Sequence, residues 1–589
     1  LKKNTEDTRF DTTPTDTRLT VRTNLDVKVT ESTLLKAGIV GRLKEFRGTR
    51  YGRSAIFNKI YGIPSAAFPI RYENGIYGGS SVYGTGNPVA LLKDYGHIRN
   101  VYGTLLADLS IRQDLSALTK GLAAEASVSF DNIGGMNETT NKEYRYMNSN
   151  ASITSDGTLV TTPAIYGTDS ETLGHTQPFE RLMLRSDFQA KVDYNRTFGK
   201  HQVGGALIYD MQSVVKNGRN NSQKNQSVLV NATYTYDNRY SLNAVFNRSG
   251  SAYLPDGDKY SNYPAVSAAW IVSNEAFMEK VTPINLFKIR ASYGLSGWDG
   301  NLSHELWRQS YGSGGAGYNF GVNAGGQSGG SEGDLPVIGL VAEKSQKATF
   351  GFDLAAFDNR LNATVEGFYE KRSDILVSGA NSTSGIIGIT VGQVNEGIYK
   401  YKGVDASLSW NDKIGDFHYG IGASMSYLNT EVVNVNQAYQ EYDYLYTKGN
   451  RIGQMYGLEA IGFFNSQQEI NNSPQQTFSD VAPGDVKYKD QNGDNRIDEK
   501  DVVKMFGSSV PRFYFGFNLN FSYKRLELSA DFQGMTGVTV SLLNSPLYSP
   551  LVSNGNISNT FLNEEISWTP ENKTNATMPR LTTQENLNN

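Results

Sequence analysis

An acidic segment near the C-terminal end of the sequence has the residue types and the spacing of a calcium-binding loop. Side-chain oxygens fall at loop positions 1, 3, 5, 9 and 12, on Asp490, Asn492, Asp494, Asp498 and Asp501. Hard oxygen ligands at this spacing converge on a hard cation in EF-hand loops. Arg496 at position 7 would add its backbone carbonyl oxygen, and Ile497 would anchor the loop inward.

Two positions of this segment depart from the EF-hand pattern. Asn495 replaces the usual position-6 Gly, and Asp501 replaces the bidentate Glu at position 12. Asn tolerates a left-handed backbone, whereas the shorter Asp weakens binding or favours a smaller ion. The segment therefore predicts a structural calcium site formed by Asp490, Asn492, Asp494, Arg496, Asp498 and Asp501. The alternative is a solvated acidic turn.

Two other patterns carry little chemistry. Gly312 to Gly317 matches the dinucleotide pattern G-x-G-x-x-G, but it precedes Tyr318 in a Gly-rich stretch without a following amphipathic helix, so we predict a flexible loop. The five histidines are scattered, and none has a sequence neighbour at metal-ligand or nucleophile–base spacing: His97, His175, His201, His304 and His418. The sequence therefore predicts no catalytic site and no enzyme.

A tyrosine-rich segment, Tyr439-Gln440-Glu441-Tyr442-Asp443-Tyr444, interleaves aromatic rings with hydrogen-bonding groups. Such a surface suits a sugar or a peptide, because rings stack and polar side chains fix orientation. Ordinary loop packing explains the same residues equally well.

The elements that must position these loops are predicted to be paired antiparallel strands. Apolar and polar residues alternate with a period of two on both sides of short polar turns, which is typical of strands with one apolar face. The turns Asp237-Asn238-Arg239 and Asp358-Asn359-Arg360 use the same chemistry. The first turn joins the apolar positions 230, 232, 234 and 236 to 240, 242, 244 and 246, and the second joins 350, 352, 354 and 356 to 361, 363 and 365. Two further pairs of predicted strands are 404–410 with 417–425 and 515–523 with 526–532.

Composition favours one large closed sheet in a membrane. The chain contains Gly 60, Tyr 35 and Phe 27, with a mean hydropathy of -0.44. No run approaches the roughly 18 apolar residues of a membrane-spanning helix, so strands must do any spanning. A net charge of -4 excludes a basic nucleic-acid surface, and zero cysteines exclude disulfides, thiol catalysis and Cys-based metal sites.

Connection lengths alternate along the chain. Short turns alternate with long polar segments at 137–180, 299–335 and 467–511. Short periplasmic turns and long outer loops are typical of outer-membrane barrels. A propeller or a series of sandwiches is the alternative, but the uneven loops and the lack of a fixed repeat period count against it.

Several motifs, in order along most of the chain, resemble the SusC/RagA family of TonB-dependent outer-membrane transporters of Bacteroidetes. They are Asn87 to Ala90, Tyr263 to Trp270 with Glu275 to Met278, Leu286 to Gly294, Pro483 to Asp490, Pro511 with Phe515 to Phe517, and Trp568 to Asn572 with Pro579-Arg580. The segment Arg248-Ser249-Gly250-Ser251 departs from the family's Arg-x-Asp-Gly-Ser-Ser segment, since it lacks the Asp and one Ser.

This resemblance implies an all-β, large antiparallel transmembrane β-barrel in the class of about 22 strands when complete. It implies that residues 1–589 are barrel, incomplete at both ends, with a plug and a regulatory-like domain upstream. The implied function is TonB-dependent import of oligosaccharides or oligopeptides, with outer-membrane lipid around the barrel, a SusD-like surface lipoprotein as lid and the TonB-ExbB-ExbD complex as energy source. A passive porin and a barrel enzyme are the alternatives.

Overall fold

The dominant feature of the computed structural model is a 17-stranded sheet whose strand pairs are antiparallel. The structure describes residues 13–170, 172–216, 222–319, 326–379, 386, 388–389, 391–542, 551–552, 556–557, 566–582 and 586–588. In these ranges, no helix has the length and apolar character that crossing a membrane requires. The sheet confirms the predicted all-β fold class.

The sheet is a meander in which sequence neighbours pair. From one edge to the other its strands are β1 (Thr15–Thr30), β2 (Thr33–Thr49), β4 (Gly96–Asp114), β5 (Leu122–Asn141), β9 (Phe179–Phe198), β10 (His201–Val215), β11 (Ser222–Tyr236), β12 (Tyr240–Ser251), β13 (Tyr260–Ile271), β14 (Ile284–Trp298), β17 (Glu343–Ala356), β18 (Leu361–Ser378), β19 (Gln393–Ile414), β20 (Phe417–Asn434), β27 (Phe513–Tyr523) and β28 (Leu526–Thr536). Strand β8 (Gly174–Thr176) adds to the end of β5. No pairing joins β1 to β28 among the described residues.

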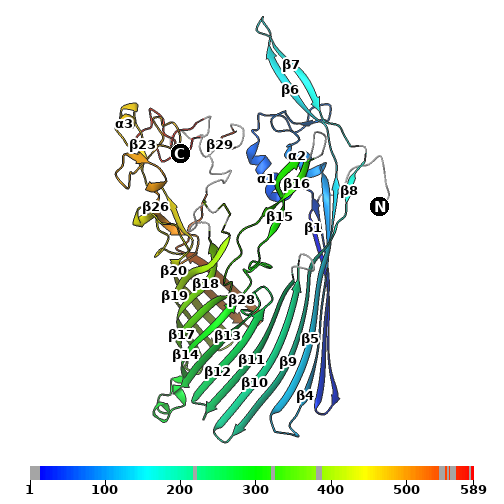
Figure 1. The fold of residues 1–589 in the computed structure, drawn as a ribbon, viewed down its shortest axis with the longest axis vertical. Helices are drawn as coiled ribbons and strands as arrows, with labels where there is room; N and C mark the ends of the chain where they lie inside the picture. The colour runs from blue at the N-terminus through cyan, green and yellow to red at the C-terminus, as the bar shows by residue number, and fades with distance from the viewer. Residues whose placement is uncertain are drawn as a thin grey trace.

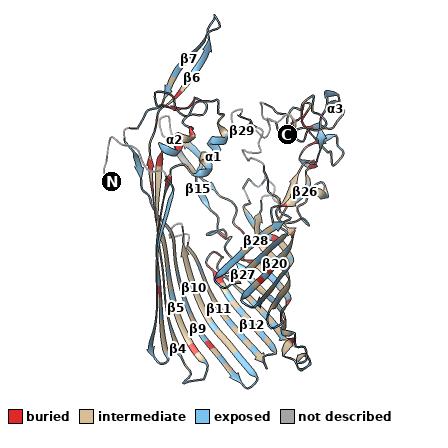
Figure 2. Cartoon of the chain, turned by 180° about the vertical axis from the view of Figure 1, so that it is seen from behind, coloured by how far each residue is buried: buried red, intermediate tan, exposed pale blue. Residues whose placement is uncertain are grey.

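Alternation along each strand separates two faces of this sheet. The register places Val230 opposite both Leu207 and Phe246, so apolar side chains form continuous rows across strands. These side chains are about half exposed, and few strand residues are buried (Figure 2). An apolar face without a protein core is the outward, lipid-facing face of a membrane barrel. The opposite face carries the polar partners, such as Asn231.

The two ends of the sheet differ as the sequence predicted. At one end, tight turns join β9 to β10, β11 to β12, β17 to β18, β19 to β20 and β27 to β28, at the bottom of Figure 1. Asp237, Asn238, Asp358 and Asn359 in these turns have φ between 50° and 64°. Asn and Asp tolerate this left-handed backbone better than most residues. The other end carries the long connections.

Small elements fill these long connections. They are α1 (Arg53–Gly62), β3 (Tyr77–Gly78), α2 (Pro88–Lys93), β6 (Tyr146–Ile153), β7 (Leu159–Tyr166), β15 (Tyr311–Asn319), β16 (Gly326–Glu332), η6 (Asp443–Leu445), β21 (Gln454–Gly457), β22 (Ala460–Phe463), α3 (Gln467–Asn471), β23 (Gln475–Gln476), β24 (Val486–Tyr488), β25 (Arg496–Ile497), η7 (Glu499–Asp501), β26 (Val503–Ser508), β29 (Leu551–Val552) and β30 (Asn556–Ile557). The turns η2 (Val272–Asn274) and η3 (Ala276–Met278) follow β13 at the opposite end.

Buried apolar clusters lie in these connections. One cluster contains Tyr253, Leu254, Leu302, Val337, Leu340 and Ala342, and another contains Tyr77, Ala90 and Tyr144. A third region, which we call the outer lobe, comprises residues 435–512 and the described residues of 566–588. It holds the fully buried Phe464 and Ile497, and α3, β23 and the C terminus lie together in Figure 1.

Candidate functional site

The acidic segment forms a compact turn in the outer lobe, and its carboxylates hold its own backbone. Asp490 accepts hydrogen bonds from the backbone N–H of Gly493 (2.7 Å) and Asn495 (2.9 Å). Asp494 accepts from the N–H of Arg496 (2.8 Å). Anionic acceptors make strong bonds to N–H donors, so the loop is ordered by its own side chains.

Two details of this loop confirm its predicted backbone. Asn495 has a φ of 63°, the left-handed conformation expected where an EF-hand has Gly. Ile497 is only 1% exposed and pairs with Gln476 in the short parallel ladder of β25 and β23. The loop is therefore anchored inward through Ile497, as the spacing predicted.

Asp501, predicted as a ligand, makes hydrogen bonds within the loop. Its side chain is fully buried, and its two oxygens accept from the N–H groups of Gln491 (2.8 Å) and Asp498 (2.9 Å). It forms a capping box with Asp498 at the start of η7. Asp501 thus closes the loop through both carboxylate oxygens.

Of the remaining predicted ligands, Asp494 and Arg496 are exposed, whereas Asp490, Asn492 and Asp498 are half-buried. Asn492 donates to a carboxylate oxygen of Asp494 (3.0 Å), so these two side chains are adjacent. The Arg496 guanidinium lies 3.9 Å from Asp498. Among the described residues, no group of three or more His, Cys, Asp or Glu side chains is arranged to hold a metal ion. Calcium binding stays a prediction, resting on oxygen chemistry and loop backbone.

The tyrosine segment packs against the acidic loop. The Tyr444 hydroxyl donates to the backbone carbonyl of Lys500 (2.8 Å), and the Lys500 ammonium pairs with Glu441 (2.8 Å). The rings of Tyr442 and Tyr444 stack with centroids 5.4 Å apart. Two candidates that lie about 50 residues apart in sequence therefore form one surface.

Electrostatics couple these two segments as well. Burial raises the pKa of Tyr444, and the negative carboxylates of Asp501, Asp490 and Asp494 raise it further. The hydrogen bond to Glu441 raises the pKa of Lys500. Because a negative field disfavours the phenolate, Tyr444 stays a neutral hydrogen-bond donor at physiological pH. Tyr439, 85% exposed, extends the surface toward solvent.

Elsewhere in the outer lobe, a buried carboxylate joins the segment before the acidic loop to residues near the C-terminal end. Asp485 is fully buried and accepts from Arg580 Nε (2.6 Å), Asn586 Nδ2 (2.9 Å) and the N–H of Ala482 (2.8 Å). Gly484 has a φ of 97°, and a Cβ there would lie 2.4 Å from the Trp568 ring. Sequence reasoning found these residues as separate motifs but missed that they meet.

The remaining sequence candidates are the glycine-rich stretch and the histidines, most of which lie in strands. The Gly312 to Gly317 stretch lies in strand β15, paired with β16, rather than in the flexible loop that we predicted. His97 and His175 both lie opposite Thr140, so two of the scattered histidines are close in space. His175 lies 3.8 Å from Glu138, and His201 bonds to the Tyr234 hydroxyl (2.8 Å).

A family model described as TonB dependent receptor-like, beta-barrel matches residues 64–541. TonB-dependent receptor P26 of Formosa agariphila is 29% identical over 358 residues, covering 59% of this chain and 35% of the relative. TonB-dependent receptor SusC of Bacteroides thetaiotaomicron is 20% identical over 352 residues, covering 56% and 32%. The chain spans about a third of the length of these two relatives.

Solved structures of a transporter share this fold. The structure of the RagAB peptide importer in the open-open state matches with a TM-score of 0.73 at 16% identity, over 98% of this chain and 62% of that chain. A second structure, of the RagAB peptide transporter, matches with a TM-score of 0.70 at 16% identity, over 97% and 63%. At this identity the structural match establishes a common architecture. Together with the family model and the SusC relative, it confirms the resemblance to the SusC/RagA family that the motifs predicted.

Proposed function

This chain belongs to the TonB-dependent receptor-like β-barrel family of the bacterial outer membrane, and from that membership we propose that it forms the wall of an importer for oligosaccharides or oligopeptides. In this proposal a SusD-like lipoprotein binds the substrate above the long loops. The TonB-ExbB-ExbD complex then supplies the energy for uptake. SusC and the RagAB importer are the relatives that support this assignment.

The observation that carries the proposal is the division of the sheet into an apolar and a charged face. On the face opposite the apolar one, Lys288 pairs with Asp353 (3.1 Å), and Arg290 bonds to Glu366. Paired charges tolerate a water-filled passage but are expensive in lipid. The two faces of the sheet therefore support a barrel wall between lipid and a water-filled lumen. A water-filled lumen suits the passage of a hydrophilic oligomer.

The outer lobe supports the choice of an oligomeric substrate. Its stacked Tyr442 and Tyr444 and the exposed Tyr439 offer rings beside Glu441 and Lys500. Sugar rings and peptide side chains both stack on such faces, while the charged groups bind their polar edges. We propose that this surface receives substrate or its lipoprotein carrier at the mouth of the barrel.

Uptake in cells tests the proposal. A strain lacking the gene should lose growth on one class of oligosaccharide or oligopeptide, and complementation should restore it only when TonB is present. Uptake that persists without TonB would indicate a passive porin instead. Hydrolysis of the oligomer by the purified protein would indicate a barrel enzyme.

A structural ion in the acidic loop is the second candidate. We propose that calcium binds the side-chain oxygens of Asp490, Asn492, Asp494, Asp498 and Asp501 and the Arg496 carbonyl, with Asp501 also closing the loop. The left-handed Asn495 favours this proposal, because EF-hand loops need that conformation at position 6. The ion would stiffen the loop against which Tyr444 packs.

A further inference from the structure

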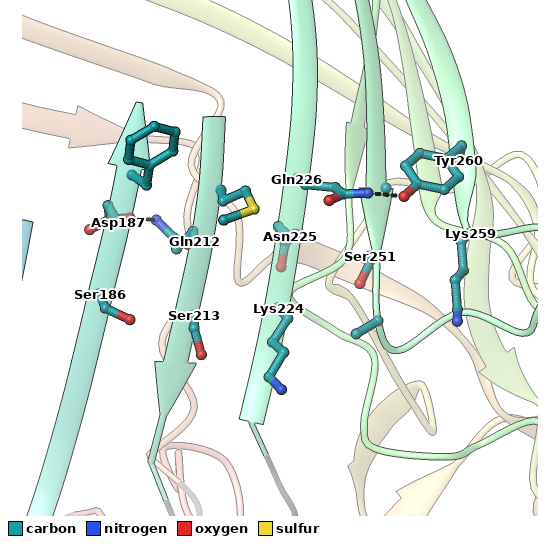
Figure 3. Close-up of a pocket in the computed structure, with 14 residues that line it drawn as sticks. Ser186, Asp187, Gln212, Ser213, Lys224, Asn225, Gln226, Ser251, Lys259 and Tyr260 are labelled. Atoms are coloured by element: carbon teal, nitrogen blue, oxygen red, sulfur yellow. Dashed lines mark hydrogen bonds between the residues drawn. The ribbon is translucent and has the colours of Figure 1, made fainter. Parts of the chain in front are cut away.

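A groove of about 410 Å³ lies on the sheet where β9 to β13 approach the long connections (Figure 3). One row of residues crosses it from strand to strand in register: Phe188, Met211, Gln226, Gly250 and Tyr260. In β11 the row contains Gln226, whose side chain points to the same face as the lipid-facing Val228 and Val230 because the three lie two residues apart. The groove therefore opens on the outward face.

Its depth in the membrane follows from strand geometry. Ten residues separate Gln226 from Tyr236, the outward ring beside the tight turn. At about 3.4 Å per residue and a tilt of about 40°, they span about 26 Å along the barrel axis. The apolar band of an outer-membrane barrel is about 25 Å tall. The groove thus lies at the outer boundary of the band, level with lipid headgroups.

The groove is built from specific contacts. The Gln226 amide donates to the Tyr260 hydroxyl, and the Arg248 guanidinium lies 5.6 Å from the centre of the Tyr260 ring. A Cβ on Gly250 would lie 2.6 Å from that ring, so glycine makes room for it. Phe188 makes an edge contact with Tyr209, 6.5 Å between centroids. Aromatic rings at this depth match the interfacial girdle.

Two lysines, Lys224 and Lys259, line the groove, and Arg248 lies next to the Tyr260 ring at its edge. Lys224 and Arg248 are exposed and occupy strand positions whose side chains point outward. Lys259 directly precedes strand β13. In Figure 3 the ammonium groups of Lys224 and Lys259 extend in the same direction. Lys259 pairs with Asp256, whose side chain is 83% exposed. Asp187 also lines the groove, but its carboxylate is held by Gln212 (2.8 Å) and Arg185 (2.8 Å). Lys224 and Arg248 form no ion pair among the described residues, so the outward surface beside the groove carries unpaired positive charge.

We propose that this groove binds the phosphorylated headgroup of an outer-leaflet lipid. Arg248 and the two lysines would contact phosphate oxygens, since guanidinium and ammonium groups make charge-assisted bonds to phosphate. The acyl chains would lie on the apolar row below, along Val228 and Phe246. A cationic groove at the membrane interface attracts anionic headgroups specifically from the adjacent leaflet.

The experiment measures lipid retained by the transporter purified from outer membranes. Native mass spectrometry after exchange into nanodiscs of phosphatidylcholine with bisphosphorylated lipid A should detect bound lipid A. Retention should fall about tenfold or more in the combined variant Lys224→Gln, Arg248→Gln and Lys259→Gln, because three charge contacts are lost. The matched control neutralises three exposed cations at the opposite end, Lys120→Gln, Lys524→Gln and Arg525→Gln, and should retain lipid A as the parent does.

Two further measurements identify the ligand. Lipid A without its phosphates should be retained about tenfold less by the parent, and excess inorganic phosphate should leave the bound lipid in place. Equal retention by parent and groove variant, equal retention of dephosphorylated lipid, or displacement by free phosphate would each overturn the proposal. A photoreactive phosphorylated lipid needs no variant: cross-links within residues 224–260 support the site, and cross-links only elsewhere refute it.

Discussion

The sheet and the outer lobe are stabilised in opposite ways. Outward residues of the sheet, such as Leu408 and Phe350, are 52% and 64% exposed, because lipid rather than protein covers them. In the outer lobe, Phe464 and Ile497 are 1% exposed, and Asp485, Asp501 and Ser508 are fully buried. The sheet distributes its stability over many equivalent hydrogen bonds, whereas the lobe concentrates it in a few side chains.

This difference has a consequence for mutation. A strand residue in the sheet has its backbone held on both sides by neighbours, so most single changes lose only a local contact. A buried polar residue in the lobe satisfies several partners at once, and its loss leaves them unpaired. Changes in the lobe should therefore be larger and more dependent on the particular residue.

The largest effect should follow Asp485→Ala. The change leaves the Arg580 guanidinium, the Asn586 amide and the Ala482 N–H without their carboxylate. Breaking a buried pair costs about 3 to 5 kcal/mol. Since the Arg580 side chain is 29% exposed, we expect the low end of this range. Hydrogen exchange should rise throughout the outer lobe and stay unchanged in the barrel strands.

The control for this change is Asp358→Asn, which removes the charge of a carboxylate that is 90% exposed in its pair with Arg360 and keeps a residue that tolerates the left-handed backbone there. Its cost should be below about 1 kcal/mol. Equal exchange profiles for the two variants would show that the lobe does not depend on its buried carboxylate.

A smaller effect should follow a charge placed on the lipid-facing side of the sheet. Leu408→Arg exposes a guanidinium to hydrocarbon, at a cost of about 2 to 4 kcal/mol near the midplane. The adjacent Ser407 points to the other face, so Ser407→Arg should cost far less. Urea unfolding in lipid bilayers measures both. Similar costs would contradict the assignment of the two faces.

Calcium should stabilise the outer lobe and leave the sheet unaffected. An ion at 100 times its dissociation constant adds about 2.7 kcal/mol to the state that binds it. We expect slower proteolysis within residues 453–511 with calcium than with chelator, and Asp494→Ala should abolish the difference. Glu499→Ala, at a position of the same loop that is not a ligand, should preserve it. Identical digestion of the parent in both conditions would refute the site.

The smallest effect concerns the tight turns of the sheet. Asn238 has a φ of 52°, which β-branched residues adopt poorly, so Asn238→Val should cost about 1 to 2 kcal/mol. Asn238→Gly should be nearly neutral, since glycine adopts this conformation freely. Unfolding in bilayers distinguishes the two. A neutral valine would show that the turn relaxes.

The sequence alone predicted the features that depend on local chemistry. Alternating side chains specify the two faces of a strand, so the rows through Val230 and Phe350 were predictable from spacing. The Asp and Asn residues at the turns, and Asn495 in the acidic loop, adopt the left-handed backbone expected of them. The alternation of short and long connections also followed from the positions of the polar segments.

Only the tertiary structure decided which distant residues meet. Asp485 and Arg580 are 95 residues apart, and Tyr444 reaches Lys500 across 56. The lipid-facing groove draws its row from five strands, whose register sets Gln226 beside Gly250 and then Tyr260. Local spacing defines what one strand presents. The register of strand pairing, and the path by which distant segments come back together, define which residues lie beside that strand. Both depend on the whole sheet.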